Sequence, residues 1–371
     1  MNNKLVENLS LWQLFIVIFI FELGSAAVVG IGGEAKQDAW IAIAVATVLG
    51  IGLVAFYIIL LSMVPGKNLF EVFCFCFGKW LGKLISLMYV IYFFYIAARV
   101  LRDFCELIAS SIFEETPIEV IAISMILVVS YMLYLGLEVL GRASEIFIPY
   151  LFSFIIIIGI FILFSGEMEF TNLLPVLPEG LGPVFKAVFP SILTFPFGEL
   201  IAFTILFPAI TKRKKVLPVG ILAVLVSGLV LIYNSIVQIA TLGPEMKERS
   251  NFPLLSAARE ISLLEFIERV DLIIVFIVMY GIIVKVGVFF YGGLKGLELI
   301  FNRSYRAMIV PIGTLIAFFS IEVSHNFAEH IQEGLEVVPM YFHVPFQIII
   351  PMLVFPILYW KVKKQQKEKS Q

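Results

Sequence analysis

The sequence predicts an all-α integral membrane protein with ten transmembrane helices, and three observations support this prediction. The chain has 371 residues, of which 61% are hydrophobic and 15% charged, and its mean hydropathy is +1.02. A soluble globular domain is nearer 45–50% apolar and about 25% charged. Several apolar segments, among them one with the charge-free run Phe152–Phe164, reach the roughly 20 residues that a bilayer requires. Lysine and arginine are also enriched in every second connection between these segments, as expected when the connections lie alternately on the two sides of the membrane.

The ten apolar segments follow one another with short connections. They lie near residues 10–32, 39–64, 84–101, 118–137, 146–164, 187–210, 216–243, 268–294, 307–324 and 343–360. If both termini are cytoplasmic, the inner connections hold 17 lysines and arginines and the outer ones hold 6. Because cytoplasmic loops are enriched in these residues, we predict a multi-pass protein with both termini in the cytoplasm.

Two of the spans are interrupted by small and polar residues. Glu22–Ala26 interrupts the first span, and Phe195–Glu199 interrupts the sixth. Breaks at equivalent places in two halves are typical of an inverted repeat with a binding site at the midplane. We therefore expect one transmembrane domain over the whole chain, with a first repeat near 10–164, a second near 187–360 and a short basic cytoplasmic tail at 361–371.

The breaks have a direct physical use. The N-terminus of a half-helix presents free N–H groups that suit a carboxylate, and its C-terminus presents carbonyls that suit an ammonium group or a metal cation. Gly24 and Gly198 allow the backbone to approach a small ligand closely. The pair of breaks fits a zwitterion such as an amino acid. The alternative is that Pro190, Pro196 and Pro208 merely kink a packed helix.

Five charged residues are candidates for positions inside the membrane, namely Glu322 and the four that can pair with one another, Glu22, Arg99, Glu199 and Lys285. A charge near the bilayer centre costs about 2.5–3.5 kcal/mol on the insertion scale, so each one needs a stabilising partner or a function. Two acids and two bases can pair with one another. Pairing among themselves and a direct role with a ligand both remain open.

No catalytic, metal or cofactor site is expected from the sequence. The histidines and acids near the end of the chain are interpreted as solvated surface, because their spacing fits no single helix face (His325, Glu329, His330, Glu333 and His343). The run Lys212–Lys215 is interpreted as a determinant of topology that touches anionic lipid in the bilayer, and no nucleic-acid partner is expected.

Several short motifs occur along the chain, each at a definite place relative to the spans. They are Gln37–Trp40, Gly78–Gly82, Gly136–Glu138 with Gly141-Arg142, Asn172–Leu177, and Gly180–Pro183. Together these motifs resemble the spore germination permease family, the B subunits of nutrient germinant receptors in endospore formers. The resemblance covers essentially the whole chain. It implies the amino acid–polyamine–organocation superfamily and a leucine-transporter-like fold, in which helices 1 and 6 are broken.

The resemblance also implies a function. A B subunit lies in the inner membrane of the spore beside an A subunit and a C lipoprotein, and it detects amino acids, sugars or nucleosides. We expect such a sensor, with an amino acid as the favoured nutrient, to signal germination through a shift between two conformations. The alternatives are an amino-acid permease that performs actual transport and a receptor-gated path for ions or water.

The ligand pocket implied by the resemblance lies between the two breaks and two neighbouring spans. Its residues are Gly24, Ser25, Ala26, Tyr95, Phe197, Gly198, Glu199 and Lys285. The Lys285 ammonium is expected to take the place of sodium in sodium-coupled relatives, against carbonyls of the first break. Proton-coupled relatives carry a lysine in the fifth span, and Ile146–Phe164 has none, which argues against proton-coupled transport by that route.

Overall fold

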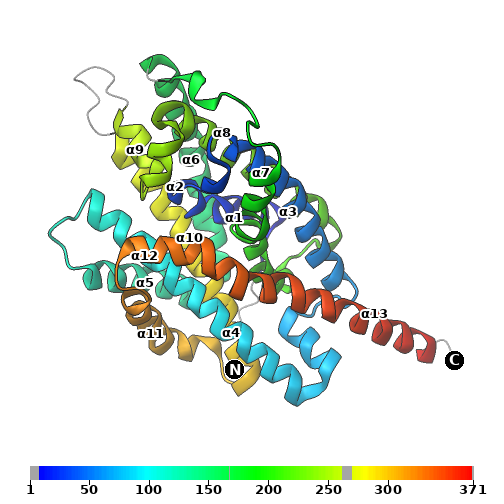
Figure 1. The fold of residues 1–371 in the computed structure, drawn as a ribbon. Coiled ribbons are helices and arrows are strands. Elements are labelled where there is room, and N and C mark those ends of the chain that lie inside the picture. Colours follow the sequence, from blue (N-terminus) through cyan, green and yellow to red (C-terminus); the bar gives the residue numbers. More distant parts are fainter. Residues whose placement is uncertain (1–7, 167, 261–269, 370–371) are drawn as a thin grey trace.

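The computed structural model describes residues 8–166, 168–260 and 270–369, and these residues are nearly all helical (Figure 1). Within these ranges ten helices are long and apolar enough to cross a membrane. This confirms the all-α membrane fold and the ten spans predicted from the sequence. Residues 268 and 269 of the expected eighth span and residues 370–371 of the tail lie outside the described ranges.

The helices are labelled in chain order, and short 3₁₀ or π segments are labelled η. The first half contains α1 (Leu11–Leu23), α2 (Ala26–Val29), η1 (Gly33–Asp38), α3 (Ala39–Ser62), α4 (Leu69–Ser111), α5 (Ile118–Leu135), α6 (Leu137–Ser165) and η2 (Phe170–Leu173). The second half contains α7 (Gly182–Ala187), η3 (Val188–Ile192), η4 (Phe197–Ile205), η5 (Phe207–Ala209), η6 (Arg213–Lys215), α8 (Val216–Arg249), α9 (Pro253–Glu260) and α10 (Val270–Phe301). The chain ends with η7 (Tyr305–Met308), α11 (Ile309–Glu322), α12 (Phe327–Gln332), η8 (Glu333–Val337), η9 (Pro339–Ile349) and α13 (Ile350–Lys369).

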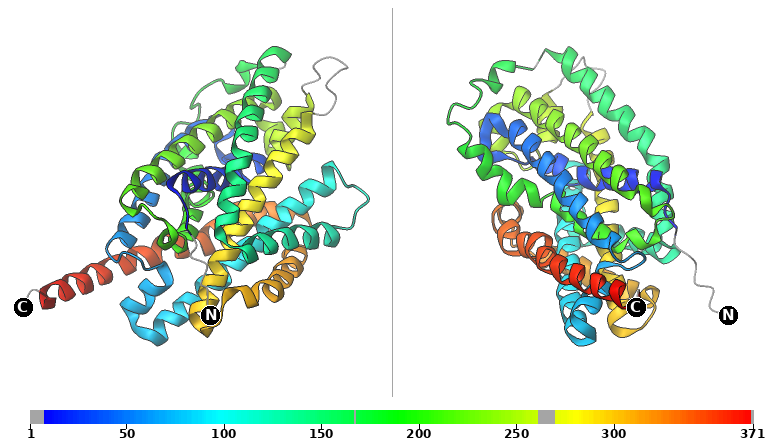
Figure 2. Two further views of the ribbon diagram at one scale, coloured as in Figure 1. Left: turned by 180° about the vertical axis from the view of Figure 1, so that it is seen from behind. Right: turned by 90° about the vertical axis from the view of Figure 1, so that its right-hand side faces the viewer.

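The first span runs through the interior of the bundle. Helix α1 packs against α6, α8 and α10, and in both views of Figure 2 it is enclosed by the other helices. It is apolar around its whole circumference, and nearly all its residues after Trp12 are buried. A helix that is apolar on every side is expected to be buried. The apolar composition of Leu11–Leu23 therefore explains why α1 lies at the centre of the bundle.

The third span is preceded by a short helical segment that the apolar pattern does not indicate. Helix α4 begins at Leu69, because Asn68 and Glu71 form a capping box with two hydrogen bonds of 2.9 Å. The backbone leaves the helical conformation at Gly78 (φ 81°, ψ 175°), and the helix of the third span resumes at Lys79. Because Lys79 and Lys83 are charged, the apolar run near residue 84 begins slightly inside this helix.

Both breaks predicted from the sequence are present. The first span stops at Leu23 and restarts at Ala26. The sixth span is divided into α7, η3 and η4, and the chain turns between η3 and η4 around Phe195 and Pro196. Segment η4 contacts α3, α4, α10 and η9, so the second break lies inside the bundle, where neighbouring helices surround the interrupted backbone. Helix α13 extends beyond the rest of the bundle (Figures 1 and 2).

Candidate functional site

The first break is held in close contact with α10. A Cβ atom at Gly281 would lie 3.0 Å from the Cα of Gly24, and a Cβ at Gly24 would lie 3.1 Å from the Cδ of Lys285. Distances this short mean that neighbouring atoms would have to shift before a side chain fits at either glycine. The two backbones therefore touch at the break, and the aliphatic stem of Lys285 lies directly beside it.

The side chain of Lys285 joins the first break to the second. Its Nζ lies 2.5 Å from Oε2 of Glu199 on η4, and both side chains are almost completely buried. The ammonium also lies 4.4 Å from the ring centre of Phe195 and 5.3 Å from that of Phe21. Such contacts between a cation and an aromatic face stabilise a buried charge. The ammonium thus faces the second break, and no hydrogen bond to a carbonyl of the first break is found in the described part of the chain.

A chain of hydrogen bonds surrounds the second break. The hydroxyl of Tyr57 lies 3.3 Å from the carbonyl of Gly198 and 2.8 Å from that of Gln347. The amide of Gln347 donates to the hydroxyl of Tyr92 (2.8 Å), which in turn lies 2.8 Å from Nδ1 of His343. These contacts supply partners for backbone groups that the interrupted helix leaves free.

A small polar cavity opens beside Glu199. Its volume is about 50 Å³, and residues of both broken helices line it together with residues of α4 and of the segment from α12 to η9. Val29 comes from the first broken helix, and Phe195 and Glu199 come from the second. Arg99 and His343 lie on its other walls. The cavity therefore brings an acid and a base together between segments that are far apart in the sequence.

Arg99 closes one side of this cavity. Its guanidinium donates to the carbonyl of His330 and contacts Oε2 of Glu333 and the hydroxyl of Tyr95, both at 3.3 Å. Nε2 of His330 lies 2.9 Å from Oδ1 of Asp103. These contacts hold α12 and η8 against α4 beside the cavity.

The interpretation of the terminal histidines as solvated surface is wrong for two of them. His330 and His343 are each 2% exposed, because they lie on the face of α12 and η9 that packs over the polar cavity. Nε2 of His330 contacts Asp103 and Nδ1 of His343 contacts Tyr92, whereas Nδ1 of His330 has no hydrogen-bond partner among the described residues. Among the described residues no group of three potential metal ligands is found.

The four charged residues that were expected to pair inside the membrane have different partners. Lys285 pairs with Glu199, whereas Arg99 pairs with Glu333, an acid outside the predicted set. Glu22 is 0% exposed, and within the described ranges neither of its carboxylate oxygens has a hydrogen-bond partner. The structure thus brings Glu22, Glu199 and Lys285 to one place and holds Arg99 at another.

The remaining residues of the expected pocket lie around the two breaks. Ser25 and Ala26 are each 1% exposed and follow the first break, Phe197 is buried in η4, and Tyr95 is partly buried beside Arg99. Of the eight expected pocket residues, Glu199 lines the polar cavity. Gly24 lines a second cavity on the opposite side of the first break.

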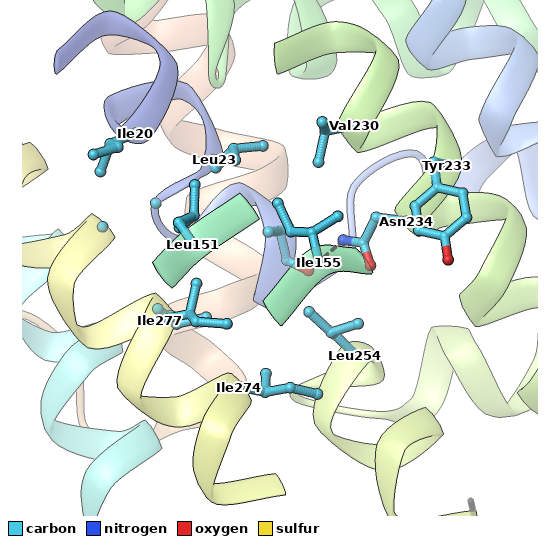
Figure 3. Close-up of a pocket in the computed structure, with 14 residues that line it drawn as sticks. Ile20, Leu23, Leu151, Ile155, Val230, Tyr233, Asn234, Leu254, Ile274 and Ile277 are labelled. Atoms are coloured by element: carbon cyan, nitrogen blue, oxygen red, sulfur yellow. Dashed lines mark hydrogen bonds between the residues drawn. The ribbon is translucent and has the colours of Figure 1, made fainter. Parts of the chain in front are cut away.

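This second cavity is larger and apolar. It has a volume of about 80 Å³ and lies between the first broken helix, α6, α8, α9 and α10. Figure 3 shows Ile20 and Leu23 on one side, and Leu254, Ile274 and Ile277 around the rest of the space. The polar groups at its edge come from α8. It suits an apolar group and offers no charged group to orient a zwitterion.

Two polar residues of α8, which the sequence analysis does not consider, support the first break. The amides of Asn234 and Gln238 donate to the carbonyl of Ala27 at 2.7 and 3.3 Å. Lys247, farther along α8, donates to the carbonyl of Ile31 at 3.3 Å. Asn and Gln four residues apart lie on one face of a helix. That spacing inside an apolar span is the signal that would have identified them.

Replacing Asn234 by Leu tests this support. We expect the Asn234→Leu variant to lose about 1 kcal/mol of unfolding free energy, because the carbonyl of Ala27 keeps only the longer contact with Gln238. Chemical denaturation of the purified protein in detergent measures the loss. Leu229→Asn, at an exposed position of the same helix, is the control. An Asn234→Leu variant as stable as the parent contradicts the role of the amide.

Comparisons with known proteins agree with this architecture. The sequence profile of the family described as spore germination protein matches residues 8–328. The chain belongs to this family. It is 36% identical to spore germination protein KB of Bacillus subtilis (strain 168), over 98% of both chains. It is also 28% identical to spore germination protein A2 of the same organism, over 72% of this chain and 73% of the relative.

Solved structures show that this family member has the leucine-transporter fold. The crystal structure of MhsT in complex with L-phenylalanine superposes with a TM-score of 0.64 over 93% of this chain and 85% of that one, at 12% identity. Mhp1, a nucleobase-cation-symport-1 family transporter in a closed conformation with bromovinylhydantoin bound, gives a TM-score of 0.67 over 97% and 94%, at 10% identity. The fold implied by the family resemblance is therefore confirmed.

Proposed function

We propose that this protein is the B subunit of a spore nutrient germinant receptor, which binds a small nutrient and signals germination. The nutrient pocket is the polar cavity beside the second break, extended toward Gly24, Ser25 and Ala26 when the pocket opens. An amino acid is the favoured ligand, and a sugar or a nucleoside is the alternative. The proposed pocket also includes Tyr95, Phe197, Gly198, Glu199 and Lys285, the residues that the family resemblance implies; Glu199 lines the cavity directly.

One observation carries this proposal: a buried cavity between the two broken helices has an acid on one wall and a base on another. Glu199 and Arg99 both line it. Oppositely charged groups in a cavity largely withdrawn from water orient a zwitterion, since each attracts one end of the ligand more strongly than in water. Among solved proteins of this fold, MhsT binds L-phenylalanine, which supports an amino acid as the ligand class.

The setting of the subunit completes the proposal. It lies in the inner membrane of the spore with both termini in the cytoplasm, beside an A subunit and a C lipoprotein. The basic connections Lys212–Lys215 and 361–371 lie on the inner side under this orientation. The two halves, near 10–164 and 187–360, form an inverted repeat. The similarity to germination protein KB over nearly the whole chain supports the receptor role.

A second candidate function is amino-acid transport by the isolated chain. The observation that favours it is the similarity of the whole fold to transporters such as Mhp1. Uptake of radiolabelled amino acids into proteoliposomes separates the two functions. Saturable uptake above equilibrium favours a permease, whereas binding without uptake favours a sensor.

Thermal unfolding of the full chain in lipid nanodiscs tests the nutrient pocket. Amino acids, glucose and inosine are added singly, and a ligand that binds the folded state raises the melting temperature. We expect at least one amino acid to do so, and Arg99→Leu to remove the effect. Arg142→Leu is the matched control, because Arg142 forms an exposed pair with Glu138. Equal shifts in the parent and Arg99→Leu contradict the proposed pocket.

The germination assay then tests the receptor role. Spores that lack this chain are expected to lose the response to the nutrient that stabilises the purified protein, and to keep the response to unrelated nutrients. Restoring the parent gene should restore the response, whereas the Arg99→Leu gene should not. A full response without the chain contradicts the receptor role and leaves the binding result unaffected.

A further inference from the structure

Glu22 occupies an unusual position for an acid. It lies in the last turn of α1, two residues before the first break, and it is 0% exposed. Within the ranges that the structure describes, neither carboxylate oxygen accepts a hydrogen bond. An ionised carboxylate in such a place is strongly unfavourable, and a buried acid normally avoids it by becoming neutral.

The end of α1 makes a negative charge still less favourable. The carbonyls of the last helical turn have no partners within the helix, and they give this end a partial negative charge. No basic residue lies in the last turn of α1. A neutral carboxyl group, by contrast, carries no charge for these carbonyls to repel. The local backbone therefore favours the protonated form.

The surrounding elements provide one cation for two acids. Lys285 of α10 and Glu199 of η4 are the ionisable groups that interact with Glu22, and Lys285 is already in contact with Glu199 at 2.5 Å. With both acids ionised, the cluster of Glu22, Glu199 and Lys285 has one excess negative charge. One proton makes the cluster neutral.

Charged groups on the other helices packed against α1 are engaged elsewhere. On α8, Lys247 donates to the carbonyl of Ile31 and to Ser235. On α6, Glu145 accepts from Gln13 near the start of α1, and Arg142 pairs with Glu138.

The tyrosines on these helices do not change the net charge around Glu22. Tyr280 of α10 contacts Ser144, and Tyr150 of α6 and Tyr233 of α8 are neutral in their ordinary state. Tyr291 of α10 contacts the ring of Tyr305. None of these groups supplies a second positive charge to Glu22.

We propose that Glu22 is a proton-binding site, which holds one proton at neutral pH while Lys285 is bound to Glu199. The proton keeps the buried cluster neutral. If the Lys285 ammonium moves from Glu199 to Glu22, the proton leaves to solvent, and Glu199 becomes available to another cation. The occupancy of the site is thereby linked to the contact that joins the two breaks. The proton site goes beyond the nutrient pocket and does not depend on it.

Infrared spectroscopy of the full chain in lipid nanodiscs tests this site without any nutrient. A carboxylic acid and a carboxylate have distinct stretching bands, and exposed acids are ionised at neutral pH. We expect the parent protein to show the band of one neutral carboxylic acid at neutral pH, and Glu22→Gln to lose it. Glu298→Gln, which alters a partly exposed pair with Lys295, should retain it. Glu199→Gln should lose it, because Lys285 is then free to pair with an ionised Glu22. The acid that carries the proton is therefore identified with two other variants: Glu22→Asp should shift the frequency of the band, and Glu199→Asp should not.

A stability measurement keeps the result interpretable. Because Gln resembles a protonated Glu in shape and charge, Glu22→Gln is expected to unfold at the same temperature as the parent at neutral pH. If the parent shows no neutral acid band, or if Glu22→Gln keeps it, the proposal is overturned. A frequency shift in Glu199→Asp with none in Glu22→Asp places the proton on Glu199 and also overturns it.

Discussion

Replacing Lys285 by Met is expected to destabilise the folded protein by about 3–5 kcal/mol, the loss seen when one partner of a buried ion pair is removed. Glu199 loses its ionic partner at 2.5 Å and remains 1% exposed. Met keeps most of the side-chain volume, so the stem still packs beside Gly24. Chemical denaturation in detergent, compared with the parent protein at neutral pH, measures the change.

The double variant Lys285→Met with Glu199→Gln separates charge from packing. Removing both charges is expected to restore most of the lost stability, because no uncompensated charge then remains in the pair. Lys295→Met is the matched control on the same helix, since Lys295 pairs with Glu298 at a more exposed position and should lose less than about 1 kcal/mol. A double variant as unstable as Lys285→Met contradicts this explanation.

Replacing Gly198 by Leu is expected to abolish the nutrient response and to reduce the unfolding free energy by about 1–3 kcal/mol, as overpacking typically does. A Cβ at this position would lie 2.9 Å from the Cδ of Gln347. The displaced amide would break its contact with Tyr92, and the second break would move away from Tyr57. Spore germination and thermal unfolding measure the two effects separately.

Gly52→Leu is the control for this variant, because nothing lies within 4 Å of a Cβ at Gly52 and the residue is exposed on α3. It should leave both stability and response unchanged. A Gly198→Leu protein that is present in normal amount and still supports a full response would exclude the second break from the nutrient pocket.

The fold was predictable because its main determinants are local. Span number follows from hydropathy, and the broken spans follow from Gly24 and from the Pro and Gly residues of Phe195–Glu199. The short helical segment before Gly78 is not predictable from hydropathy, because its start depends on a cap at Asn68.

The candidate site was only partly predictable, because its partners are distant in sequence. Lys285 and Glu199 were expected as intramembrane charges, and the structure pairs them. The choice of Glu333 as the partner of Arg99 depends on how α12 and η8 fold back over α4, which hydropathy does not report. The burial of His330 and His343 follows from the same folding-back.

The position of Lys285 has a mechanical consequence. Its stem is fixed against Gly24 and its ammonium against Glu199, so one side chain acts as a strut between the two interrupted helices. Because Lys285 is anchored on α10, its contacts link both interrupted helices to the same neighbouring helix. Under the proposed function, a ligand that competes for Glu199 is expected to weaken this link at the second break.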